Sequence, residues 1–253
     1  MYRQAEVLPP PERFEEARRQ GQQALEQREG IGTLKERSLH AVLKYWFSPD
    51  EACHERKVGR YVADVFDGER IVEIQTGSAY RLQPKLEAFL PAYPVTVVLP
   101  LVRRKTLTWI DPQTGEASRP RRSPKVGRPG DALPELYPLL AWLDHPHLTV
   151  ALVMLDVEEY RLQDGWGNGG KRGSHRAERV PESLGETVVL HGSADLRRLL
   201  PEGLPTPFTR ADFSRLARLR GRKLSSAISA LLKAGVILHT GKEKRAYLYT
   251  PAP

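Results

Sequence analysis

Two β-rich runs joined by a tight turn constrain the fold of this chain more than any other feature of its sequence. The runs span residues 57–66 and 70–75, and Asp67-Gly68 lies between them. An Asp-Gly pair flanked by such runs is the strongest short-range signal for a β-hairpin. We therefore expect two antiparallel strands here.

The hairpin places two acidic side chains on one face. A two-residue loop would pair Phe66 with Glu69, whereas a four-residue loop would place Asp64 directly opposite Glu73. Either register puts Asp64, Glu73 and Gln75 on the same face, because side chains alternate along a strand. The two carboxylates would then lie within about 5–8 Å of each other. Like charges that face each other are destabilising, so we expect a positive group between them. A divalent cation with oxygen ligands is the simplest candidate.

Size and composition limit the class of protein. A chain of 253 residues can form one large domain, or a medium domain and a small one. Its single cysteine, Cys53, excludes an internal disulfide framework and is typical of a reducing compartment. The first thirty residues do not have the pattern of a secretory leader, and no apolar run approaches the ~18 residues of a membrane span. We expect a cytoplasmic protein without a membrane partner.

Positive charge is concentrated at the C-terminal end. Residues 207–253 contain ten Lys and Arg residues but only two acidic residues, Asp212 and Glu243. This local excess equals the net charge of the whole chain, +8. Such a concentration favours a polyanionic partner, nucleic acid first, and the alternative is a merely solubilising surface.

Strands alternate with helices along the rest of the chain, which predicts an α/β core with a mixed sheet. A polar helix or arm precedes this core. The expected helices lie at about 33–46, 79–90 and 133–144, the expected further strands at 95–99, 107–110 and 147–157, and the expected loops or connectors at 111–131, 163–180 and 193–206.

The order of these elements and acids resembles the PD-(D/E)xK nuclease superfamily, and especially the layout of archaeal Holliday-junction resolvases. The matching residues are Lys35-Glu36 on the first helix, Gly59-x-x-x-x-Asp64, and Glu73-Ile74-Gln75. The resemblance covers roughly residues 32–110. It implies a restriction-endonuclease-like mixed sheet flanked by helices, and a Mg²⁺- or Mn²⁺-dependent nuclease.

The resemblance also implies roles for individual residues. Asp64 and Glu73 would bind the metal, and Glu36 would support the site. Ala63 stands where the family name has Pro, and Gln75 stands where the family has the Lys that positions or activates the attacking water. Gln carries no charge and cannot act as an acid or base, although some restriction-type members have Gln there.

Other residues can supply the positive charge that Gln75 lacks. Lys85 on the following helix is one candidate and Lys44 on the first helix is another, while His40 shares the face of Glu36 and could orient a water or a phosphate. These candidates have structural alternatives. Glu36 can be only the capping-box acid of its helix, His40 a satisfied interior or surface histidine, and Lys85 a solvated helix residue. A degenerate nuclease fold that binds DNA without cutting it also remains open.

A Gly-rich basic segment follows the predicted strand at 147–157. Gly165-x-x-x-x-Gly170-Lys171 nearly spells a P-loop, but Arg172 replaces the Ser or Thr that would bind Mg²⁺, so an NTPase is not indicated. We expect a basic loop that holds a nucleic-acid backbone. Its contact residues would be Lys171, Arg172, His175 and Arg176, with Trp166 stacking on a base.

Residues 208–253 are similar to a winged helix-turn-helix, in which the second helix enters the major groove of DNA. Thr209 would cap the first helix, a longer helix would run from Lys223 to Ala234, and Gly235 would end it. The expected DNA contacts are Arg222, Lys223, Ser225, Ser226 and Ser229 on the second helix, and Lys242, Lys244 and Arg245 in the wing. Many winged helices bind proteins instead, which is the alternative.

Together these patterns predict three regions: a polar arm at 1–31, a nuclease-like domain at 32–200 and a winged-helix domain at 201–253. The expected function is Mg²⁺-dependent hydrolysis of DNA, duplex or branched. The alternative is an inactive nuclease-fold regulator that binds DNA. Resolvase-like relatives often act as dimers, so the resemblance allows a homodimer.

Overall fold

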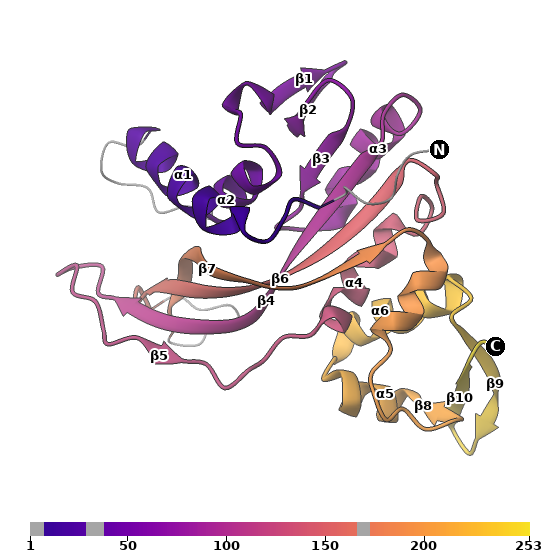
Figure 1. Ribbon diagram of the computed structural model, residues 1–253. Coiled ribbons are helices and arrows are strands. Elements are labelled where there is room, and N and C mark those ends of the chain that lie inside the picture. Colours follow the sequence, from indigo (N-terminus) through magenta and orange to yellow (C-terminus); the bar gives the residue numbers. More distant parts are fainter. Residues whose placement is uncertain (1–7, 29–37, 166–172) are drawn as a thin grey trace.

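The structure is a computed structural model that describes residues 8–28, 38–165 and 173–253 (Figure 1). Glu36, the expected cap Thr33, Trp166, Lys171 and Arg172 lie outside the described residues. The part of the chain before Gly192 contains four α-helices and seven strands among the described residues. In chain order they are α1 (Arg13–Arg28), α2 (Ser38–Phe47), β1 (His54–Val58), β2 (Tyr61–Phe66), β3 (Ile71–Ile74), α3 (Gln83–Phe89), β4 (Val95–Ile110), β5 (Arg121–Arg122), α4 (Leu133–Leu136), β6 (Leu148–Leu162) and β7 (His175–Leu190).

The seven strands form one mixed sheet, in the order β1-β2-β3-β4-β6-β7, with β5 paired to the outer part of β4. Strand β2 pairs antiparallel with β1 on one side and with β3 on the other. Strands β3, β4 and β6 run parallel, and β7 returns antiparallel to β6. The expectation of an α/β fold with a large mixed sheet between helices is therefore confirmed.

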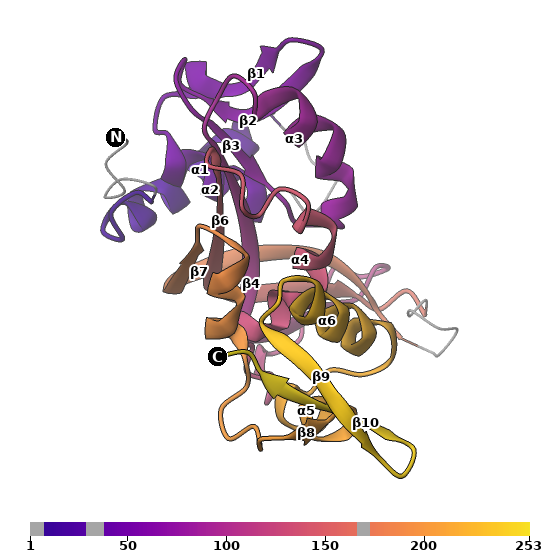
Figure 2. The same ribbon diagram turned by 90° about the vertical axis from the view of Figure 1, so that its right-hand side faces the viewer.

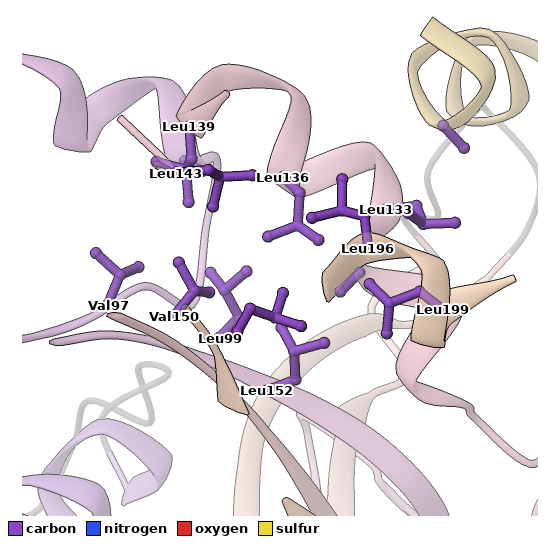
Figure 3. Close-up of a cluster of buried hydrophobic side chains, with 14 of the residues drawn as sticks. Val97, Leu99, Leu133, Leu136, Leu139, Leu143, Val150, Leu152, Leu196 and Leu199 are labelled. Carbon is purple, nitrogen blue, oxygen red and sulfur yellow. The ribbon is translucent and has the colours of Figure 1, made fainter. Parts of the chain in front are cut away.

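Helices cover both faces of this sheet (Figure 1). On one face, α1 and α2 pack Phe14, Leu43 and Trp46 over buried strand residues such as Val98 and Ala151. Because side chains alternate along a strand, the residues next in sequence to Val98 and Ala151 point to the opposite face. There they meet α3 and the segment around α4. Figure 3 shows this second core, in which the labelled residues are Val97, Leu99, Leu133, Leu136, Leu139, Leu143, Val150, Leu152, Leu196 and Leu199.

The two strands expected at 95–99 and 107–110 are one continuous strand, β4, which runs through Pro100. The prediction of two separate strands was wrong, and the strand pairing explains why. Strand β3 pairs with β4 only as far as Ile74 and Val98. Residues two apart in a strand direct their backbone groups to the same side. The nitrogen of Pro100 therefore points to the same side of β4 as that of Val98, but at a position beyond the end of β3. No ladder hydrogen bond is lost there.

Two further segments differ from expectation. The region 163–180, expected to be a loop, contains the start of β7, which pairs with β6 from His175 onward. Pro181 is accommodated because it sits beside a register shift in that ladder. The helix expected at 133–144 is only one turn of α-helix, followed by a 3₁₀ turn at Tyr137–Leu139. Pro138 cannot donate the backbone hydrogen bond that a continuing helix needs.

The C-terminal part forms a small α/β unit from β8 (Phe208–Thr209), α5 (Arg210–Ala217), α6 (Gly221–Lys233), β9 (Ile237–Glu243) and β10 (Ala246–Pro251). Thr209 caps α5 in a capping box with Asp212, as expected, and Gly235 follows α6 with a positive φ of 68°. A 3₁₀ turn at Ser193–Leu199 connects this unit to β7.

The small unit shares its hydrophobic core with the main sheet. Figure 2 shows α6 beside α4, and Phe208, Phe213 and Leu231 belong to the same buried cluster as Leu136. Lys233 Nζ also donates to Tyr137 Oη at 2.9 Å. This continuity fixes the unit against α4. Within the described ranges, no helix has the length and apolar character needed to cross a membrane.

Candidate functional site

The hairpin adopts the longer of the two expected loops. Val65 pairs with Val72 and Phe66 pairs with Ile71, so four residues, 67–70, form the turn. The Asp67 carboxylate stabilises this turn by accepting hydrogen bonds from the backbone N–H groups of residues 69 and 70, at 3.0 and 2.8 Å. Extending the observed register by one residue places Asp64 opposite Glu73.

Asp64 lies where the two strands begin to separate. The backbone ladder between β2 and β3 ends at Val65, and the Oδ2 atom of Asp64 accepts a hydrogen bond from the N–H of Ile74 at 2.7 Å. The side chain thus replaces a backbone acceptor and is held at the strand junction. From α2, His40 Nε2 approaches the same oxygen at 3.2 Å. The helix that carries His40 therefore contributes directly to the environment of Asp64.

Glu73 points from β3 toward α3. The residue is 1% exposed, and both of its carboxylate oxygens accept hydrogen bonds from Lys85 Nζ, at 3.0 and 2.7 Å. Pro84 lies in the first turn of α3, where its missing N–H costs no helical hydrogen bond. Leu86 and Phe89 anchor the helix in the core. This packing brings Lys85 to the acid at a partly exposed position.

The titration behaviour of the two acids reflects their proximity. Burial and the negative charge of Asp64 raise the pKa of the Glu73 carboxyl to about 7, against the opposing effect of Lys85. Burial also acts to raise the pKa of Asp64, but the hydrogen bond and charge of His40, the backbone of Ile74 and the charge of Lys85 together lower it. Asp64 is therefore the anion of the pair near neutral pH, whereas Glu73 is only partly ionised there.

Two other predicted site residues lie differently. Gln75, half-buried at the end of β3, donates from Nε2 to the backbone oxygen of Ser78 at 3.1 Å. Lys44, considered as a substitute for the missing lysine, is buried and donates to Glu55 at 2.7 Å instead. Lys44 is thus part of a separate ion pair, and the suggestion that it serves the acidic site was wrong. Lys85 is the lysine that reaches the acids.

The predicted DNA contacts fall into two groups. His175 and Arg176 lie on β7 rather than in a loop, and His175 Nδ1 pairs with Asp164. The second group lies in the C-terminal unit. Arg222 and Lys223 at the start of α6 and Lys242, Lys244 and Arg245 in the β9–β10 hairpin are exposed, and Ser225, Ser226 and Ser229 are half-buried.

The donor chemistry of the acidic site fits a hard divalent cation. Mg²⁺ is usually held by one or two carboxylates together with waters and substrate oxygens. Asp64 and Glu73 supply two such carboxylates, and burial together with the charge of Asp64 raises the pKa of Glu73 to about 7. No group of three or more His, Cys, Asp and Glu side chains able to hold a metal occurs among the residues that the structure describes. An ion here would depend on water or substrate for its remaining ligands.

A second charged cluster was not predicted from the sequence. Glu159 on β6 is 1% exposed and contacts Lys105, Arg161 and Arg179 from three strands. The only sequence signal was the alternation Glu159-x-Arg161, which is too common to indicate a site. Strand pairing between distant segments creates this cluster.

Comparison with known proteins identifies the family of this chain. No solved structure matches this chain. A protein of Treponema pallidum (strain Nichols), described as uncharacterized, is 29% identical over 225 residues, which cover 88% of each chain. The family model described as a domain of unknown function, DUF8091, matches residues 37–191, a range that includes α2 to β7 and therefore both charged clusters. The chain belongs to the DUF8091 family.

Proposed function

We propose that this protein is a Mg²⁺-dependent nuclease of the PD-(D/E)xK type that hydrolyses phosphodiester bonds in DNA. One observation carries the proposal: Asp64 and Glu73 lie on neighbouring strands, the charge of Asp64 raises the pKa of Glu73, and a lysine from the next helix contacts Glu73. Two neighbouring acids can hold the ion for metal-assisted phosphodiester hydrolysis, and a nearby lysine can stabilise the charge that develops.

The order of elements supports the proposal. Helix α2 precedes the antiparallel strands β1 to β3, α3 follows, and β4 then runs parallel to β3. The acids occupy β2 and β3, and this location supports the proposed PD-(D/E)xK core. A restriction-endonuclease-like core is therefore part of the proposal, at a finer level than the α/β class itself.

Each residue has a role in this mechanism. Asp64 and Glu73 would hold the ion, and His40 keeps the Asp64 carboxylate oriented through its contact at 3.2 Å. A bound Mg²⁺ supplies a water of lowered pKa and neutralises charge on the phosphate. Lys85 stabilises the negative charge that develops at the phosphate, or orients the attacking water, because its ammonium is partly exposed beside Glu73. Gln75, whose amide is uncharged, can only position a water.

The basic C-terminal unit supports a role in holding DNA. In the proposal it is a winged helix whose second helix, α6, presents Arg222, Lys223 and Ser226 to the major groove. The β9–β10 hairpin would act as the wing and present Lys242, Lys244 and Arg245 to the backbone. Its shared core with α4 gives it a fixed orientation. A protein partner for this surface is the alternative.

A second function has its own supporting observation. Lys85 donates to both oxygens of the buried Glu73, and Gln75 replaces the charged residue of the family motif. A permanent Lys85–Glu73 ion pair would leave a nuclease-like fold that binds DNA without cutting it. The two proposals differ in whether the pair opens to admit a cation.

Cleavage of plasmid DNA with Mg²⁺ or Mn²⁺ separates the two proposals. The variants are Asp64→Asn and Glu73→Gln, and the control is Glu87→Gln, which removes an exposed acid from α3 near Lys85. Cutting by the wild type that is lost in both variants and kept in the control supports the nuclease. Salt-sensitive binding without cutting supports the inactive DNA-binding protein. A wild-type protein that neither binds nor cuts DNA refutes both.

A further inference from the structure

A basic cavity lies on the outer part of the sheet, away from the acidic pair. Strands β4, β6 and β7 extend well beyond the end of β3, as Figure 1 shows. Glu159 lies nine residues further along β6 than Val150, whose β4 partner Val97 is paired with Glu73. At about 3.3 Å per residue, this separates the two regions by about 30 Å along the strand.

Three cations converge on Glu159. Lys105 Nζ and Arg161 Nη1 donate to its Oε1 atom at 3.0 and 2.8 Å, and Arg179 Nε donates to Oε2 at 3.0 Å. Arg161 is fixed further by hydrogen bonds to the hydroxyl and backbone oxygens of Ser174, at 2.8 and 2.6 Å. The carboxylate thus holds the three cationic groups in one fixed arrangement.

The charges of this cluster do not balance. Burial acts to raise the pKa of the Glu159 carboxyl, but hydrogen bonds from Lys105, Arg161 and Arg179 lower it to about 2. The acid is therefore fully ionised at neutral pH and contributes one negative charge against three positive charges. One cation would suffice to neutralise a buried carboxylate. The two excess positive charges repel each other, so the arrangement favours an added anion.

A cavity of about 330 Å³ opens among these groups. It is lined by Lys105, Glu159, Arg161, Ser174, His175, Arg176 and Arg179. His175 is already paired with Asp164, and the three cations around Glu159 are each about a quarter exposed, at 23–29% of their side-chain surface. The three cationic groups are accessible to solvent, and the buried Glu159 carboxylate holds them in place. Fixed guanidinium groups suit the planar, bidentate recognition of phosphate oxygens.

We propose that this cavity binds a phosphate group, with Lys105, Arg161 and Arg179 as the binding residues and Glu159 as the residue that positions them. The phosphate can belong to a nucleic-acid backbone or to a free phosphate compound. The first source rests on the proposed DNA-binding function, whereas the second does not depend on it.

The test compares Arg179→Gln with a matched control, Arg103→Gln. Arg103 lies on β4 and makes a bidentate ion pair with Asp156 on β6, with N–O distances of 2.8 and 2.7 Å, but it does not line this cavity. Two binding assays use the full chain at fixed ionic strength: thermal stabilisation by pyrophosphate relative to chloride, and fluorescence anisotropy with a labelled DNA duplex. Arg179→Lys, which keeps the charge and loses the planar group, is added in case Arg179→Gln does not fold.

One outcome identifies a free phosphate compound. Pyrophosphate then stabilises the wild type and Arg103→Gln, and its apparent affinity is at least tenfold lower for the Arg179 variant. An unaltered pyrophosphate response with a tenfold weaker DNA affinity in the Arg179 variant alone identifies the nucleic-acid backbone. The proposal is overturned if the Arg179 and Arg103 variants match the wild type in both assays. DNA cleavage is not a readout, so failure of the nuclease proposal leaves this result interpretable.

Discussion

Two buried glutamates in the same sheet have opposite electrostatic environments. Glu73 on β3 and Glu159 on β6 are each 1% exposed, and each accepts a hydrogen bond from a lysine. The pKa of Glu73 is raised to about 7, whereas that of Glu159 is lowered to about 2. Burial acts in the same direction at both, so the neighbouring charges decide the outcome.

The comparison shows what each cluster lacks. Glu73 shares its surroundings with a second acid, Asp64, and the positive partners, Lys85 and His40, do not outnumber the acids. Glu159 faces three cations. Additional positive charge would be favourable at the first cluster, and additional negative charge at the second. We therefore propose a cation for the first cluster and an anion for the second.

The largest expected effect is on stability at pH 7. Glu159→Gln leaves three mutually repelling cations without their anion and should lower the free energy of unfolding by about 3 kcal/mol, the scale for breaking a buried ion pair. Glu73→Gln removes an acid that is already partly protonated and should cost less than about 1 kcal/mol. Urea denaturation of both variants measures the difference. Equal losses would remove the distinction between the two glutamates.

Replacement of Lys85 tests the catalytic side of the comparison. Lys85→Met should lower the rate of DNA cleavage about 100-fold, the scale for one positioned catalytic group, while the Kd for DNA stays the same. Single-turnover cleavage and anisotropy measure the two quantities. Glu87→Gln on the same helix serves as the control. An unchanged rate would exclude Lys85 from the mechanism.

The two glutamates should control opposite limbs of the stability–pH profile. Glu73 has a raised pKa, so the folded state binds its proton more tightly, and stability falls as pH rises from about 4.5 through about 7. Glu159 has a lowered pKa, so its contribution is complete above about 4.5 and is lost as pH falls toward about 2. Denaturation between pH 3 and 8 should show a flatter upper limb for Glu73→Gln and a flatter lower limb for Glu159→Gln. An upper limb that is unchanged in Glu73→Gln would contradict the assignment.

The smallest expected effect concerns the basic surface of α6, which belongs to neither cluster. The double substitution Arg222→Gln/Lys223→Gln should reduce the slope of log Kd for DNA against log salt by about 2, since each cation lost from the DNA interface contributes about 0.9. Substitution is preferable to deletion of residues 207–253, because Phe208 and Phe213 belong to the shared core. If the slope is unaltered, these residues do not contact DNA.

The acidic site was accessible to sequence analysis because short-range features define it. The turn at 67–70 sets the register of Asp64 and Glu73. Helix α3 follows β3 closely in the sequence, which keeps Lys85 near these acids. The continuity of β4 through Pro100 could not be predicted, since it depends on where β3 ends. Glu159 was missed for a similar reason, because three strands from distant parts of the sequence create its surroundings.

A titration with Mn²⁺ tests most directly the claim that Asp64 and Glu73 share a divalent cation. Electron paramagnetic resonance of the free ion reports binding, with and without a short DNA duplex. We predict one bound ion per chain for the wild type and for Glu159→Gln, and loss of that ion in both Asp64→Asn and Glu73→Gln. A wild-type protein that binds no Mn²⁺ under either condition, or equal binding by all four proteins, would contradict the claim.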